Sequence, residues 1–203
     1  MTPDDRATRS EIRKSSGRPR DDRIDDAVIA ATRELLAETG YAGLTVAEVA
    51  SRAGTTKTAI YRRWESKPHL VHDATFAGFS TVVPQSGRIA DDLHQMVDQV
   101  SAVFGSTVTR AALPGLIADM AANPGVHRRI LDGFAGVLGA FHQRLDDARA
   151  AGEVRAGVDP TLLIEMLGGA AILATLMRPD DPLDEQWSAR AHTLLSALVV
   201  ENG

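Results

Sequence analysis

The pattern of hydrophobic and polar positions is helical along most of the chain. Apolar residues recur three or four positions apart, as on one face of an α-helix, and no segment alternates as a half-buried strand does. Asp21 or Asp22 begins the first expected helix, Gly40 ends it, and Asp159-Pro160 starts a later one. The pattern predicts an all-α fold of about nine helices.

Two more short helices are expected after Gly40. The first covers 46–53 and follows a T-x-x-E capping box that begins at Thr45, and Gly54 then permits a sharp turn. Thr56 can cap the next helix, which is expected to run to about residue 64. This pattern predicts two helices joined by a tight turn.

Longer helices are expected in the remainder of the chain. The apolar spacing predicts helices at 89–108 and 126–150, with a shorter helix between Pro114 and the Asn123-Pro124-Gly125 turn. Glycine at 152 is expected to stop the long helix.

The expected helix after Thr56 has one apolar side and one polar side. Ile60 and Trp64 are four positions apart and face inward, whereas the other positions carry hydroxyls and cations. A short helix of this kind suits the major groove of DNA, where it can bond phosphates and base edges. The residues expected to face DNA are Thr45, Thr56, Lys57, Thr58, Ala59, Tyr61, Arg62, Arg63 and Lys67, of which Tyr61 and Lys67 are expected to contact its backbone. The alternative is an ordinary helical hairpin with a solvated cationic face.

Residues 1–20 lack hydrophobic periodicity and are expected to form a disordered basic arm. Within this arm, the segment 16–20 holds Arg18 and Arg20 around a proline, which keeps the backbone extended. Arginine is favoured by the negative potential of a narrow minor groove, so both arginines are expected to contact DNA. A solvated basic tail is the alternative.

Composition and charge agree with a helical protein whose N-terminal part meets phosphate. Hydrophobic residues make up 44% of the 203 residues and aromatic residues only 4%, which suits packed helices better than a β-sandwich. The net charge is −5, but residues 1–72 hold 13 Lys+Arg against 11 Asp+Glu, and residues 73–203 hold 9 against 16. The basic excess therefore lies beside the expected DNA-facing helix.

Several classes of protein are disfavoured. The chain has no cysteine, which excludes disulfides, thiol nucleophiles and cysteine zinc sites. It has no signal-peptide pattern and no apolar run near the ~18 residues of a membrane span, so a soluble cytoplasmic protein without membrane contact is expected. No P-loop, G-x-S-x-G or H-E-x-x-H motif is present, and we expect no enzyme activity, cofactor or metal. His69 and His72 lie three apart, which is weak support for a metal site and more typical of ordinary helix residues.

Residues 21–72 resemble the DNA-binding domain of the tetracycline-repressor (TetR) family of bacterial regulators. The matching residues are Gly40-Tyr41, Leu44-Thr45-Val46, Val49-Ala50, Ala53-Gly54, Ile60-Tyr61-Arg62-Arg63-Trp64, Lys67 and Leu70. The usual L-Y-x-x-F signature stands here as Ile60-Tyr61-x-x-Trp64, which keeps one aliphatic and one aromatic anchor. The resemblance implies a three-helix helix-turn-helix domain at 21–66 and a larger helical ligand-binding and dimerisation domain at 67–203.

The resemblance also implies a function. It predicts a homodimer that binds an inverted-repeat operator in double-stranded DNA, as a repressor released by a small-molecule effector that the sequence does not name. A helix at 67–79 would link the two domains, and the last two helices, 160–177 and 183–200, would form the dimer interface. The small residues at 168–171 would let helices approach there, or else pack within one protomer. The alternatives are an activator, an effector-independent DNA-binding protein, and an enzyme that has kept a DNA-binding-like domain.

An effector pocket is expected between the helices of the larger domain. Its candidate lining residues are Phe76, Phe79, Met96, Val100, Phe104, Met120, Phe134, Leu138, Phe141 and Met166. Methionine and phenylalanine side chains suit a bulky apolar effector, although each of these residues can equally be plain core.

Overall fold

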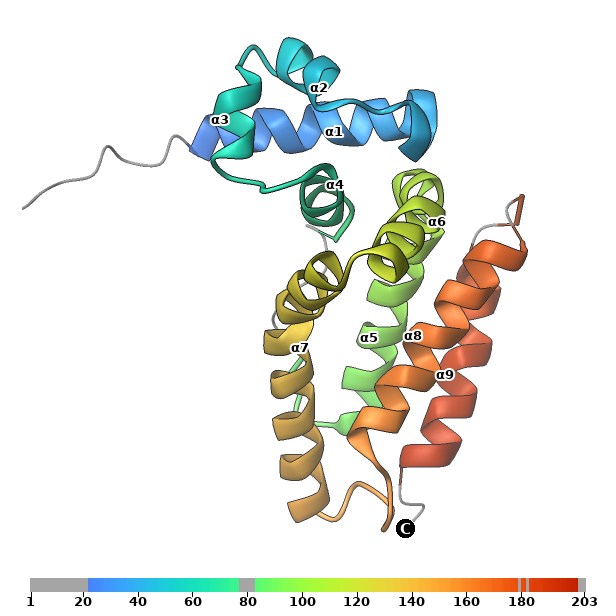
Figure 1. Ribbon diagram of the computed structural model, residues 1–203. Coiled ribbons are helices and arrows are strands. Elements are labelled where there is room, and N and C mark those ends of the chain that lie inside the picture. Colours follow the sequence, from blue (N-terminus) through green and yellow to red (C-terminus); the bar gives the residue numbers. More distant parts are fainter. Residues whose placement is uncertain (1–21, 77–82, 179, 182, 201–203) are drawn as a thin grey trace, which may run out of the picture.

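The fold is all-α, as predicted, in a computed structural model that describes residues 22–76, 83–178, 180–181 and 183–200 (Figure 1). The described residues form nine helices, and their only strand-like pairing is one bridge between Val154 and Val200. Arg18, Arg20 and Phe79 lie outside the described residues, so their predicted roles stay predictions.

The first three helices are α1 (Asp22–Gly43), α2 (Val46–Arg52) and α3 (Lys57–Tyr61). Both predicted caps are present, because Thr45 accepts a hydrogen bond from the backbone of Glu48 and Thr56 accepts one from Ala59. Gly40 has a positive φ of 68°, but one further helical turn follows it, so it breaks the helix instead of ending it. This break redirects the chain toward α2.

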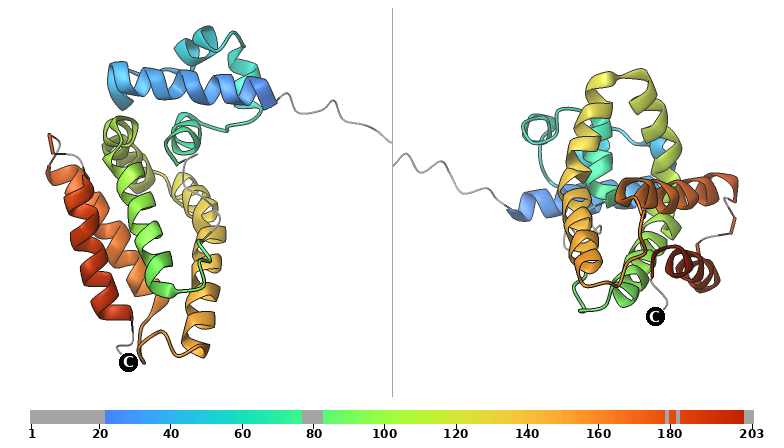
Figure 2. Two further views of the ribbon diagram at one scale, coloured as in Figure 1. Left: turned by 180° about the vertical axis from the view of Figure 1, so that it is seen from behind. Right: turned by 90° about the horizontal axis from the view of Figure 1, so that it is seen from below.

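The remaining helices are α4 (Lys67–Phe76), α5 (Ile89–Gly105), α6 (Thr107–Ala122), α7 (Pro124–Ala150), α8 (Pro160–Met177) and α9 (Glu185–Val199). Figure 1 shows α5, α7, α8 and α9 as a bundle, with α1 lying across its upper end and α6 beneath α1. The reverse view in Figure 2 shows the same order, with α8 and α9 forming one outer side of the bundle.

The junction between α5 and α6 differs from the prediction. The helix expected at 89–108 ends at Gly105, and Ser106 caps a new helix by accepting a hydrogen bond from the backbone of Thr109. The two helices are bent by 78° at this point. Pro114 lies inside α6 and does not bound it, because the loss of one backbone donor is outweighed there by the burial of Leu113 and Leu116.

Two hydrophobic clusters hold the molecule together. One lies between α5, α7, α8 and α9, and the other joins α1–α4 to buried residues of α6 and of the start of α7. In the second cluster, Leu116 and Ile130 pack together with residues of the first four helices. The predicted domain boundary between residues 66 and 67 stays a prediction, and a shared core continues across it.

A buried ion pair fixes α5 against α7. The Arg144 Nε donates to Asp92 Oδ2 at 2.6 Å, and the other carboxylate oxygen accepts the backbone N–H of Ser86 at 2.7 Å. Asp92 is fully buried, so this charge depends on both donors.

Helix α8 corrects the expectation that no segment matches a membrane span. Its 18 residues have a mean hydropathy of 1.7, and most of them are not buried. One such helix is a weak indication of a membrane span, because a helix that packs against a protein partner can have the same composition.

Candidate nucleic-acid interface

The turn between α2 and α3 and two anchors in and after α3 position this short helix. Gly54 supplies a φ of 64° in the turn, a conformation that costs other residues free energy. Ile60 and Trp64 are buried among residues of α1 and α2, as their spacing predicted. The backbone N–H of Trp64 donates to Ile60, so one helical turn continues beyond Tyr61.

Asp73 on α4 binds the indole of Trp64, with Trp64 Nε1 donating to Asp73 Oδ2 at 2.9 Å. Burial alone would raise the pKa of Asp73, but hydrogen bonds from His72 and Trp64 together hold it below its usual value. The carboxylate therefore stays charged and ties the end of α3 to α4. The sequence pattern gave no signal for this contact between Asp73 and Trp64.

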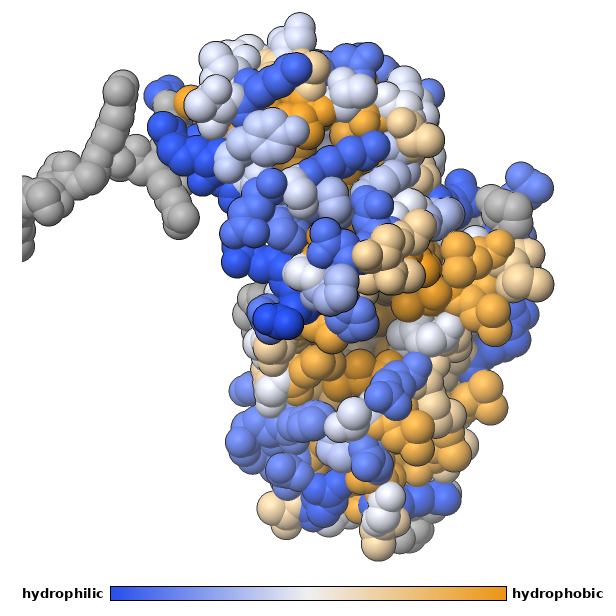
Figure 3. Space-filling model, viewed as in Figure 1, coloured by the Kyte–Doolittle hydropathy of each residue, from blue (hydrophilic) through white to orange (hydrophobic). Residues whose placement is uncertain are grey.

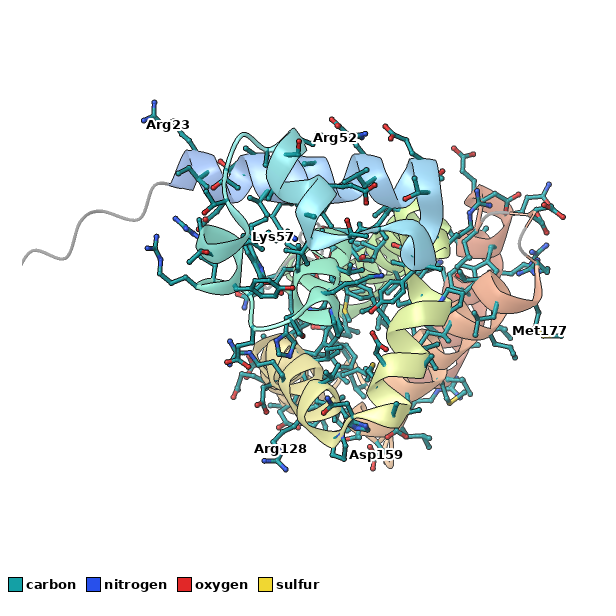
Figure 4. All side chains as sticks on the ribbon, turned by 45° about the horizontal axis from the view of Figure 1, so that its top comes forward. Arg23, Arg52, Lys57, Arg128, Asp159 and Met177 are labelled. Atoms are coloured by element: carbon teal, nitrogen blue, oxygen red, sulfur yellow. The ribbon has the colours of Figure 1, made fainter. Side chains whose placement is uncertain are left out.

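The side of α3 away from the core carries most of the residues predicted to face DNA. Thr56, Lys57, Thr58, Tyr61 and Arg62 are exposed, and Ala59 between them is half-buried. Figure 4 shows the labelled Lys57 on this helix, with Arg23 projecting from the N-terminal end of α1. Within the described residues, neither Lys57 nor Arg62 has an ion-pair partner, so both charges are open to an external anion.

Three of the predicted residues have partners inside the protein. The Thr45 hydroxyl donates to Glu48 Oε2 at 2.7 Å, Arg63 pairs with Asp25 on α1, and the Lys67 ammonium donates to the Tyr41 carbonyl at 2.6 Å. Asp25 and Tyr41 lie far from these residues in sequence, and the local pattern gave no signal for them. The predicted DNA contacts of Thr45, Arg63 and Lys67 stay predictions.

The residues predicted to line an effector pocket divide between the two hydrophobic clusters. Val100, Phe104 and Phe141 are buried among α5, α7 and α8, with Met96 packed against them. Met120 and Phe134 pack against the other cluster, Phe76 contacts both clusters, and Leu138 is exposed on α7. The ring of Phe76 contacts the rings of Phe104 and Phe134, with centroids 5.9 and 5.4 Å away.

Two surface hollows lie beside α9. One, of about 660 Å³, lies between α5 and α9, and its mixed lining includes Asp98, Glu185 and Leu183. The other, of about 510 Å³, lies between α8 and α9 and is apolar, with Met166 and Leu198 in its lining. Of the predicted pocket residues, only Met166 lines either of these hollows.

Two family models match the chain. Residues 28–74 match bacterial regulatory proteins of the tetR family, and residues 83–195 match the tetracyclin repressor-like C-terminal domain. The second match alone covers more than half of the chain. The chain belongs to the TetR family of transcriptional regulators. This is a family of DNA-binding transcriptional regulators, the class that the sequence predicted.

Curated relatives match over most of their length. An HTH-type transcriptional regulator of Mycobacterium bovis is 30% identical over 159 residues, which cover 76% of this chain and 77% of the relative. The HTH-type transcriptional regulator AqdR of Rhodococcus erythropolis is 28% identical over 163 residues, 79% of this chain and 78% of AqdR.

Solved structures of the TetR family have the same fold. The TetR family transcription regulator SCO0332 is 29% identical, with a TM-score of 0.66, and the match covers 86% of this chain and 98% of that protein. FadR from Bacillus subtilis, solved in complex with stearoyl-CoA, has a TM-score of 0.61 at 18% identity, with 84% of this chain and 96% of FadR covered.

Proposed function

We propose that this TetR-family regulator is a homodimeric repressor that binds an inverted-repeat operator through α3 and is released by a small molecule. The exposed hydroxyls and cations of α3, held by buried Ile60 and Trp64, carry the proposal. Thr58, Lys57 and Arg62 have the groups needed to bond base edges and phosphates of a major groove. Such a protein acts in the cytoplasm, where the DNA is.

The exposed apolar face of α8 and α9 supports the dimer. Large side chains on this face are exposed to solvent, with Leu173 at 61%, Met177 at 72% and Leu194 at 66%. Figure 3 shows apolar residues gathered over these two helices, and Figure 4 shows the labelled Met177 pointing outward. An apolar surface of this kind is typical of a protein interface.

Small residues in the middle of α8 divide between the outer and inner sides of the helix. Gly169 and Ala170 are exposed, and a methyl group added at Gly169 would meet no atom within 4 Å. Ala171 is buried inside the protomer. The outer pair would let a partner helix approach α8 closely. Contact with that helix would bury the apolar surface of α8, so its composition needs no membrane.

A charged substitution on this face tests the dimer. Leu194→Glu should yield monomers in sedimentation at micromolar concentration and lose tight binding to an inverted repeat. Leu131→Glu is the matched control, because Leu131 is also exposed, on α7 outside this face. If Leu194→Glu stays dimeric, the proposed interface is wrong.

An effector site in the larger domain is supported by FadR, a protein of this fold that is solved with stearoyl-CoA. The buried packing of Val100, Phe104 and Phe141 favours the second candidate, an effector-independent regulator, unless these side chains move apart. Release of operator DNA by apolar small molecules, tested against the full-length protein, separates the two candidates. A reporter gene placed behind the operator distinguishes an activator from a repressor, because the regulator raises reporter expression in one case and lowers it in the other.

Selection of bound fragments from the source genome, followed by sequencing, tests the proposal as a whole. We expect an inverted repeat, bound with nanomolar-range affinity that falls steeply as salt rises. Recovery of fragments without a shared sequence would contradict sequence-specific regulation.

A further inference from the structure

One residue, Tyr41 near the end of α1, contacts both α6 and α4 through its side chain and its backbone. Its hydroxyl donates a hydrogen bond to the carboxylate of Asp119 on α6. Its backbone carbonyl accepts a hydrogen bond from the ammonium of Lys67, the first residue of α4, and this ammonium lies 4.4 Å from the centre of the Tyr41 ring. Three helices therefore meet at one residue.

The Tyr41 ring packs against the backbone of α6 at Gly115. Gly115 lies one helical turn before Asp119, on the same side of α6. A methyl group added at Gly115 would lie 2.7 Å from Cε1 of the ring and closer still to two other ring atoms. The ring thus rests directly on the backbone of α6, and any larger residue at position 115 would displace it.

The hydroxyl group of Tyr41 keeps its proton. Burial raises the pKa of the Tyr41 hydroxyl, and the hydrogen bond to Asp119 raises it further. The hydroxyl therefore keeps its proton and donates it to the Asp119 carboxyl group. Burial lowers the pKa of Lys67.

The contacts of Tyr41 with α6 and α4 affect the orientation of α3. Lys67 begins α4 three residues after Trp64, the buried anchor that follows α3, and Trp64 is itself bonded to Asp73 of α4. The contact of Tyr41 with α6 and α4 therefore limits how α3 can turn relative to the bundle.

We propose that Tyr41, seated on Gly115 and bonded to Asp119, is a positioning residue that fixes the half-site spacing accepted by the dimer. In a two-fold dimer the distance between the two α3 helices depends on how each one is held against its own bundle. This inference rests on the proposed function, and it adds a residue that lies outside the DNA-facing surface.

The test compares operators whose central spacer is lengthened or shortened by one base pair. Each added pair moves the second half-site by about 3.4 Å and rotates it by about 35°, so wild type should lose about tenfold or more in affinity. Tyr41→Phe and Gly115→Ala should reduce this loss to about threefold or less, because α3 is then held less firmly. A single mismatch within a half-site should penalise these variants as it penalises wild type, since their base contacts are unchanged.

Gly136→Ala is the matched control, because a methyl group there meets no atom within 4 Å, and it should keep the wild-type spacing preference. If Gly115→Ala does not fold, Tyr41→Phe and Asp119→Leu carry the test, since each removes one partner of the hydrogen bond at nearly constant size. Wild-type spacing preference in the folded variants, or no preference in wild type, overturns the role of Tyr41. The role of Tyr41 is also overturned if the variants lose discrimination against altered spacers and against mismatches equally, because that result would show general damage to DNA binding. A wild type that binds no specific DNA refutes the proposed function instead.

Discussion

Replacing Arg62 and Arg63 one at a time should separate DNA binding from stability. Both arginines lie at the end of α3, but Arg62 is exposed whereas Arg63 pairs with Asp25 on α1. The side chains of Arg63 and Asp25 are 15% and 30% exposed, so the pair is only partly screened by water. We expect Arg62→Ala to weaken operator binding at unchanged stability, and Arg63→Ala to destabilise the fold.

The expected magnitudes follow from these surroundings. Loss of one phosphate contact per subunit lowers the salt slope of a dimer by about 1.8, and loss of a base contact would cost about 1–3 kcal/mol per half-site. Breaking a buried pair costs about 3–5 kcal/mol, which partial exposure reduces to about 1–3 kcal/mol for Arg63→Ala. That loss corresponds to a drop of about 2–12 °C in Tm for a chain of this size.

Two measurements check this separation at one fixed protein concentration: urea denaturation, and operator titration at several salt concentrations. The two changes affect neighbouring positions in the same turn, so their effects on helix propensity are similar. Asp25→Asn should reproduce the stability loss of Arg63→Ala without removing a cation. Equal destabilisation by both arginine variants, or a reduced salt slope in Arg63→Ala alone, would refute this assignment.

Three further predictions concern stability. Arg144→Met should cost about 3–5 kcal/mol by urea denaturation, because it leaves the fully buried Asp92 without its cation, and a loss below about 1 kcal/mol would contradict this. Burial lowers the pKa of His69, on which Glu65 acts in the opposite direction and Arg129 in the same direction. The unfolded chain then binds the proton more readily, so stability should fall as pH drops below about 6.5, and His69→Gln should flatten the fall between pH 7.5 and 5.5 in urea midpoints. An unchanged pH slope in that variant would disprove the role of His69. Gly54→Ala should cost about 1–2 kcal/mol in the same assay, because the turn needs a positive φ, and an unchanged midpoint would count against that.

The helix starts that could be predicted from sequence are those whose signals are local. Thr45, Thr56 and Asp159 each accept a hydrogen bond from a backbone three residues on, so the whole interaction lies within one short segment. The break at Ser106 has the same kind of cap, but the apolar periodicity continues through it and Pro114 is the more conspicuous breaker. The predicted boundary was therefore misplaced.

The partners of the functional side chains could not be predicted because they are distant in sequence. The exposed residues of α3 follow from helical periodicity once Ile60 and Trp64 are placed inward. Whether a cation on that helix is free depends on residues such as Asp25, 38 positions before Arg63, which no local pattern selects. The predicted effector pocket stays a prediction for a related reason, since spacing identifies apolar faces but does not show which of them leave space between them.

The shared core leads us to expect that DNA binding and any effector binding are coupled. Residues of α6 and α7 pack in the same cluster as those of α1–α4, so a ligand that separates helices of the bundle must also repack the support of α3. Packed interiors adjust between discrete arrangements and do not deform continuously, so we expect a small displacement of α6 to change the position of α3. On the proposed function the coupling must also be reciprocal: an effector that weakens operator binding by some factor is itself bound more weakly, by that factor, when operator is present. Measuring effector affinity with and without operator therefore tests the coupling, and equal affinities would show that the shared core does not transmit it.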